Sequence, residues 1–169
     1  MPSSPAHASD VQFLVRNSMN MGYQWASILV PPVYIALTVS RKGGSALSLN
    51  RSLRATWAGG LSGAALTGTA AYLRYDNSTE DSVRAQRITT AYDTSALRRN
   101  DHATIGGLVS AVLVPAIFWK RANVVNLILG GAGIGTAVGC CVHYAKLLSG
   151  DVPAKVDIVI PGPKSDSSS

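Results

Sequence analysis

The residues best suited to hold a metal ion or a haem are the adjacent Cys140 and Cys141 and the nearby His143. Thiolates and imidazoles are ligands that zinc, iron and haem prefer. Small thiols are also common in buried cores, however, and a single histidine in an apolar segment usually bonds to a carbonyl group. Neighbouring cysteines rarely meet disulfide geometry. We therefore predict no metal and no cofactor at these residues.

The glycine-rich run GGAGIG at Gly130–Gly135 is similar to the phosphate-binding fingerprint of dinucleotide-binding folds. That fingerprint follows a β-strand and opens a helix. This run instead continues a long apolar segment, so we exclude a nucleotide site. No Ser/His/Asp set or carboxylate pair is placed for catalysis, and the apolar segments hold no charged residue of the kind that pumps and carriers use. We predict that the chain is not an enzyme.

All acidic and basic residues lie outside four uncharged stretches. These are Gly22–Ser40, Ala55–Leu73, Ala103–Trp119 and Ala122–Ala145. Each has about the length, roughly 20 residues, that a helix needs to cross a hydrocarbon layer about 30 Å thick. A soluble bundle, the alternative, needs a charged outer face, whereas these stretches contain no charged residue and only 14% of the whole chain is charged. The stretches predict an all-α membrane protein with about four transmembrane helices arranged as two hairpins.

The stretches define a membrane domain over residues 22–146 with a tail on each side. Residues 1–21 form an N-terminal tail, in which Ser9 and Gln12 have the spacing of a capping box before a short surface helix. A tail without a helix is the alternative. Residues 147–169 end in a serine-rich run, and we expect them to be extended and partly disordered.

The loops after the first and third stretches contain six basic residues and no acid. These residues are Arg41, Lys42, Arg51, Arg54, Lys120 and Arg121. We predict that they contact phospholipid head groups, including cardiolipin, on the matrix side of the mitochondrial inner membrane. Both termini then lie in the intermembrane space. The high isoelectric point could also indicate nucleic-acid binding, but basic and aromatic residues are not interleaved, so we expect no nucleic acid.

The loop between the second and third stretches, Arg74–Asp101, is long for a connection between two helices. Ser78 and Asp81 have capping-box spacing, which predicts a surface helix over Thr79–Tyr92. Four arginines of this loop are predicted to contact neighbouring subunits, with a solvated loop as the alternative. They are Arg84, Arg87, Arg98 and Arg99.

Small residues recur every four positions in three of the stretches, which places them on one face of each helix. In the second stretch they are Gly59, Gly60, Gly63, Ala64 and Gly68; in the third, Gly107 and Ala111; in the fourth, Gly131, Gly135 and Gly139. Such faces let two helix backbones approach closely. We expect these residues to pack the chain's own helices together. Contact with partner subunits, or lining of a conduit, is the alternative.

The last two stretches resemble the four-helix family of mitochondrial preprotein translocase subunits. Asn123, the pair Gly130 and Gly131, and Gly135 fit the second half of that family's signature, and Lys120 lies one position late for its basic residue. Its aromatic position is poorly matched. The resemblance implies a component of protein import or insertion.

The whole chain resembles another family, the small NUXM-type accessory subunits of fungal respiratory complex I. The features are its length, its start MPSSPAHASDVQFLVRNSMNMGYQWA, and a first stretch with Pro31 and Pro32 followed by a basic turn. The resemblance implies a non-catalytic subunit of the membrane arm, without flavin, iron–sulfur or quinone chemistry. We therefore expect a structural subunit that supports assembly or stability, bound to other membrane subunits. A translocase component and a small channel or carrier are the alternatives.

Overall fold

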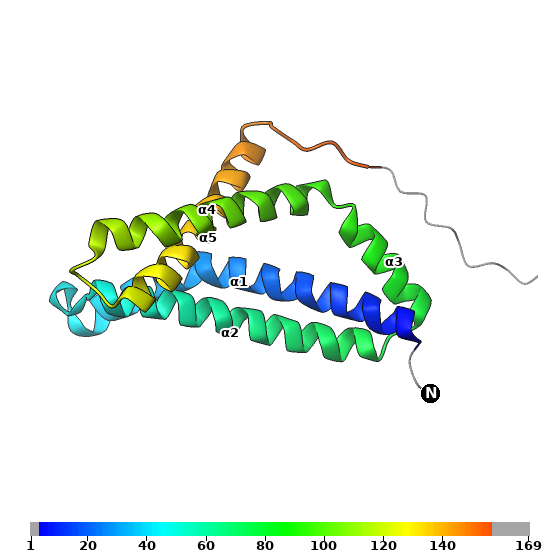
Figure 1. The fold of residues 1–169 in the computed structure, drawn as a ribbon, viewed down its shortest axis with the longest axis horizontal. Helices are drawn as coiled ribbons and strands as arrows, with labels where there is room; N and C mark the ends of the chain where they lie inside the picture. Colours follow the sequence, from blue (N-terminus) through cyan, green and yellow to red (C-terminus); the bar gives the residue numbers. More distant parts are fainter. Residues whose placement is uncertain (1–3, 157–169) are drawn as a thin grey trace, which may run out of the picture.

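The computed structural model describes residues 4–156, and this part of the chain is all-α. Its elements are α1 (Pro5–Lys42), the 3-10 turn η1 (Gly44–Ala46), α2 (Leu49–Asp76), α3 (Glu80–Ala91), α4 (Thr94–Phe118) and α5 (Val124–Leu148). Helices α1 and α2 pack side by side as one hairpin, and α4 and α5 pack as a second (Figure 1). Helix α3 connects the hairpins. The predicted all-α fold with two hairpins is confirmed.

Helix α1 is longer than the sequence predicted. It begins at Pro5, where the side chain of Ser4 accepts a hydrogen bond of 3.2 Å from the backbone nitrogen of His7. Proline suits this first position because its missing N–H group needs no partner there. Capping at Ser9 was a wrong prediction, since Ser9 lies inside the helix. Residues 5–21 and the first uncharged stretch therefore form one continuous rod.

Helix α3 agrees closely with the helix predicted over Thr79–Tyr92. Its N-cap is Thr79, and Ser78 instead donates its hydroxyl to the carbonyl of Arg74, at 2.7 Å, in the last turn of α2. Glu80 and Asp81 lie in the first turn, where negative charge is favourable.

In the first hairpin the small residues of α2 face α1. A Cβ atom added at Gly63 would lie 2.6 Å from the Cβ of Ala26 and 2.7 Å from the carbonyl oxygen of Gly22. At Gly59, Gly60 and Gly68 the same atom would meet the side chains of Val30, Tyr23 and Met19. Ala64 is buried between them. The backbones of α1 and α2 thus come closest at Gly22 and Gly63.

In the second hairpin the glycines lie directly against backbone. A Cβ atom added at Gly135 would lie 2.0 Å from the carbonyl oxygen of Gly106. A Cβ atom added at Gly139 would lie 2.1 Å from the carbonyl oxygen of His102. At Gly131 it would lie 2.8 Å from the carbonyl oxygen of Ser110. Gly107 faces Thr136, and Ala111 is half-buried. Side chains larger than hydrogen therefore cannot fit at this interface without separating the helices.

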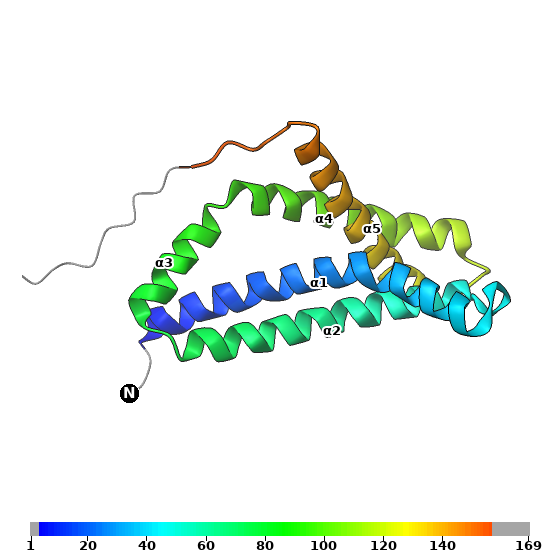
Figure 2. The same cartoon turned by 180° about the vertical axis from the view of Figure 1, so that it is seen from behind.

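Helix α5 also joins the two hairpins. Gly130 lies against Leu53, and Gly133 lies against Thr56. Nearby, the Asn126 side chain donates to Asn50 at 2.8 Å and accepts from the Trp57 indole at 3.0 Å. These contacts place the α1–α2 and α4–α5 connections at the same end of the molecule, as Figures 1 and 2 show from opposite sides.

By length and composition, α4 and α5 are the two helices within residues 4–156 that are apolar enough to cross a membrane, and α4 is mostly unburied. The stretches in α1 and α2 are less apolar and are also offset from each other. Gly22 lies against Gly63 and Thr67, and Val30 lies against Gly59. The last turns of the second stretch therefore lie beside the charged N-terminal half of α1.

Candidate functional site: a polar frame between the hairpins

Away from the connecting loops, the N-terminal half of α1, all of α3 and the first turns of α4 form the three sides of a triangle in the ribbon, which we call the polar frame (Figure 1). One corner is the contact of α1 with α3. Val11, Leu14 and Val83 form a small buried core there. Val15 and Tyr75 pack against this core from outside. Burial of apolar side chains therefore stabilises the contact between α1 and α3 independently of any charged group.

An ion pair reinforces this first corner. The carboxylate of Asp10, whose side chain is only 10% exposed, accepts a hydrogen bond from the Arg87 guanidinium, whose side chain is 45% exposed. The guanidinium also lies 5.6 Å from the centre of the Phe13 ring. Because one partner is largely withdrawn from water, the pair is less screened than a surface salt bridge. Hydrogen bonds from Ser4 lower the pKa of Glu80 at the start of α3.

The second corner is a side-chain contact between α1 and α4. Gln24 is 3% exposed, and both ends of its amide are bonded. The nitrogen donates to Asn100 at 2.8 Å, and the oxygen accepts from Arg99 at 3.0 Å. A buried amide without these partners would cost free energy, so this contact adds to the α5 contacts in positioning the second hairpin on the first.

The third corner is the turn from α3 into α4. Asp93 caps α4 by accepting from the backbone nitrogen of Ala96 at 3.0 Å. Thr94 donates to the carbonyl of Ala154 at 2.7 Å, which brings the segment after α5 back to this corner. Arg98 binds Asp151 in the same segment, with one bond of 2.9 Å. This bonding raises the pKa of Arg98 and lowers the pKa of Asp151.

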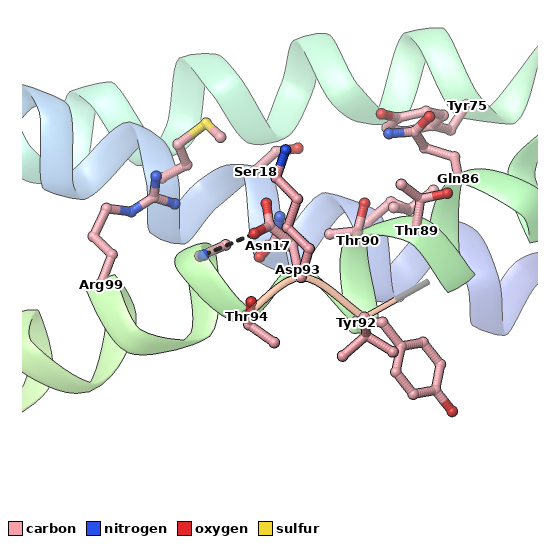
Figure 3. Close-up of a pocket in the computed structure, with 15 residues that line it drawn as sticks. Asn17, Ser18, Tyr75, Gln86, Thr89, Thr90, Tyr92, Asp93, Thr94 and Arg99 are labelled. Carbon is pink, nitrogen blue, oxygen red and sulfur yellow. Dashed lines mark hydrogen bonds between the residues drawn. The ribbon is translucent and has the colours of Figure 1, made fainter. Parts of the chain in front are cut away.

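Two cavities, of about 530 and 700 Å³, open into the frame. Both are lined by Asn17, Thr90 and Ala96, so the two cavities are neighbours. Figure 3 shows the first of these cavities, with amide and hydroxyl side chains from α1 and α3 around it. The charged residues that line the two cavities together are Arg16, Arg87, Arg99, Lys155 and Asp93. Four basic residues outnumber the one acid in this lining, and one of the four, Arg87, is paired with Asp10, so the lining is polar with a smaller net positive charge.

The four arginines predicted to contact neighbouring subunits are therefore divided. Arg87 and Arg99 line the frame and bind Asp10 and Gln24 of the same chain. Arg98 binds Asp151, and Arg84 is exposed on α3. Contact with other subunits stays a prediction for all four.

Sequence reasoning missed the partners of these arginines. Gln24 and Asn100 could have been noticed as amides at the edges of apolar stretches, although nothing in their spacing indicated that they meet. Asp10 lies on the rod that the sequence divided into tail and span. The partners come from segments about 50 to 77 residues away, which local pattern does not reach.

Cys140 and His143 are buried on α5, and Cys141 is exposed. The His143 ring lies 6.0 Å from the His102 ring, centre to centre, and its Nε2 is 3.4 Å from the Ser95 hydroxyl. Within residues 4–156, no group of three or more His, Cys, Asp or Glu side chains converges on one point.

Comparison with protein-family models, with curated proteins and with solved structures found no match.

Proposed function

We propose that this protein is a non-catalytic structural subunit of a mitochondrial inner-membrane assembly, namely the membrane arm of respiratory complex I. In this proposal α1, α2, α4 and α5 each cross the membrane. Many of their outward side chains are large and apolar, including Leu66 at 73% and Val112 at 71% exposed. Side chains of this kind are stable against lipid or against other membrane helices.

The observation that carries the proposal is the polar frame. The frame contains two polar cavities, of about 530 and 700 Å³, and contacts at its three corners hold the surrounding elements in place. Its hydrogen-bonding, net-positive lining suits a polar segment of a neighbouring subunit that lies between α1 and α3. Matched charges in such a contact would supply specificity and orientation.

The six basic residues at the opposite end orient the protein in this proposal. The contacts of Asn50 with α5 bring both acid-free connections to one end, whereas every acid among residues 4–156 lies toward the frame. We assign the basic end to the matrix side and the frame to the intermembrane space, on the expectation that short loops rich in Lys and Arg lie on the inner side of the membrane.

Native gel electrophoresis of solubilised mitochondria tests the assignment. A complex I subunit comigrates with the complete enzyme, whereas comigration with a smaller translocase assembly would overturn the proposal.

The frame is tested separately by the variant Asn17→Trp, which obstructs the two cavities from α1. Leu66→Trp on the outward face of α2 is the matched control. We expect Asn17→Trp to remain in the membrane but to be lost from complex I, and Leu66→Trp to assemble normally. Normal assembly of both variants would show that no partner occupies the frame.

A further inference from the structure

The basic end of the first hairpin contains a small cavity of about 230 Å³. One face of α1 supplies Tyr34, Leu37, Thr38, Arg41 and Lys42, η1 supplies Ala46, and α2 supplies Arg51. Positions 34, 38 and 41 are separated by three or four residues, so their side chains lie above one another on the helix. The cavity is therefore built from two helices and the turn between them, and three of the six basic residues at this end line it.

The potential in this cavity is positive and uncompensated. No acid occurs between Asp10 and Asp76, or between Asp101 and Asp151. The end of α1 and the start of α2 meet here, so their helix-end dipoles oppose each other and the net potential comes from the side chains. Thr38 gives its hydroxyl hydrogen to the Tyr34 carbonyl at 2.8 Å. The Thr38 hydroxyl therefore has no hydrogen left to donate to an anion. The groups of the cavity that attract an anion are the side chains of Arg41, Lys42 and Arg51.

The cavity continues into an apolar surface on the same face of α1. Leu37 lines the cavity and is 50% exposed, and Val33, one turn earlier, is 53% exposed. An occupant that fits both parts has an anionic head beside a hydrocarbon tail. A free phosphate ion would satisfy the basic side chains but would leave this apolar strip uncovered.

We infer that this cavity binds one anionic phospholipid, with the lipid phosphate held by Arg41, Lys42 and Arg51 and an acyl chain along Leu37 and Val33. Arginine and lysine both form charge-assisted hydrogen bonds with phosphate oxygens. The inference rests on the proposed membrane location. It makes the expected lipid contact more specific, because it replaces a diffuse basic surface with one defined lipid site.

Two triple variants separate a defined site from diffuse attraction. The first replaces Arg41, Lys42 and Arg51 with Gln, and the second replaces Arg54, Lys120 and Arg121 with Gln. Both remove three positive charges from the same end, but the second leaves the cavity lining intact. The full-length protein is purified in neutral detergent, and binding of phosphatidylglycerol, phosphatidylcholine and inorganic phosphate is measured by native mass spectrometry.

We expect wild-type protein to retain phosphatidylglycerol in preference to phosphatidylcholine or phosphate. The first triple variant should weaken phosphatidylglycerol binding about a hundredfold, from roughly a factor of five per basic residue, and the second by a few-fold at most. Equal losses in the two variants would overturn the inference, as would inorganic phosphate binding as tightly as the lipid. Purified protein is used, so this result does not depend on assembly into complex I, and the two proposals fail separately.

Discussion

The two hairpins are both closed by glycines, but the glycines meet different neighbours. In α4–α5, Gly135 and Gly139 lie against the backbone carbonyls of Gly106 and His102. In α1–α2, Gly22 and Gly63 also lie against each other's backbone, but Gly59, Gly60 and Gly68 lie against side chains. Backbone cannot move aside without moving a whole helix, whereas a side chain can change rotamer. The second hairpin is therefore the more rigidly specified interface.

The hairpins also differ in register and polarity. The two stretches of α4 and α5 lie alongside each other for most of their length, whereas those of α1 and α2 share a layer of only about 12 residues, or roughly 18 Å. The N-terminal half of α1 supplies Asp10, Arg16 and Asn17 to the frame instead. An uncharged run long enough to cross a membrane therefore does not by itself determine how far a helix is shifted along its neighbour. The contacts between the two helices determine that shift.

The largest effect is expected from Gly135→Leu compared with Gly68→Leu. At Gly135 the new side chain meets the Gly106 carbonyl, and we expect a loss of about 3 kcal/mol or more in the free energy of unfolding. At Gly68 it meets the flexible Met19 side chain, and a loss of about 1 kcal/mol is expected. Unfolding by SDS in mixed micelles measures both.

Val138→Leu, on an outward position of α5 that is 56% exposed, is the control and should change stability by less than about 0.5 kcal/mol. Equal losses at Gly135 and Gly68 would show that the two interfaces do not differ as described.

A smaller effect is expected at the contact between the hairpins. Gln24→Leu removes the partner of Arg99 and Asn100 at a buried position, which should cost about 2 kcal/mol in the same unfolding assay. Hydrogen exchange in the first turns of α4 should rise as well. Gln12→Leu, at an exposed position on the same helix, should leave both quantities unchanged. An unchanged exchange rate in Gln24→Leu would mean that α4 is positioned without this amide.

The smallest effect concerns the segment after α5. Arg98 lowers the pKa of Asp151, so their contact stabilises the segment above the unfolded pKa and is lost as pH falls through the lower, folded pKa. Proteolysis near residues 151–156 should therefore stay slow at neutral pH and accelerate only below about pH 4. Asp151→Asn should be cleaved rapidly at every pH. Slow cleavage of this variant at neutral pH would show that the hydrogen bond from Thr94 to Ala154 is enough to hold the segment without the ion pair.

Much of the fold could be predicted from the sequence, because charge exclusion and helical spacing are local properties. The uncharged stretches and the cap near Thr79 located most of α2 to α5, and Gly135 and Gly139 indicated a close helix pair. The start of α1 was misplaced because Ser4 and Ser9 are both plausible caps, and the longer helix is favoured by contacts of residues 5–21 with α2 and α3, which lie far away in the sequence. The frame could not be predicted, since Asp10–Arg87 and Gln24–Arg99 join distant segments.

The central claim is that α1 and α2 cross the membrane although their apolar stretches are offset, so that η1 and α3 lie on opposite sides. The most direct measurement is labelling of single cysteines in mitoplasts by a membrane-impermeant maleimide, in a background where Cys140 and Cys141 are Ala. Both Ser45 in η1 and Ser82 in α3 are exposed positions. We predict rapid labelling of Ser82→Cys, and labelling of Ser45→Cys only after detergent is added. Labelling of both without detergent would contradict the claim, because it would place both ends of the first hairpin on one side of the membrane.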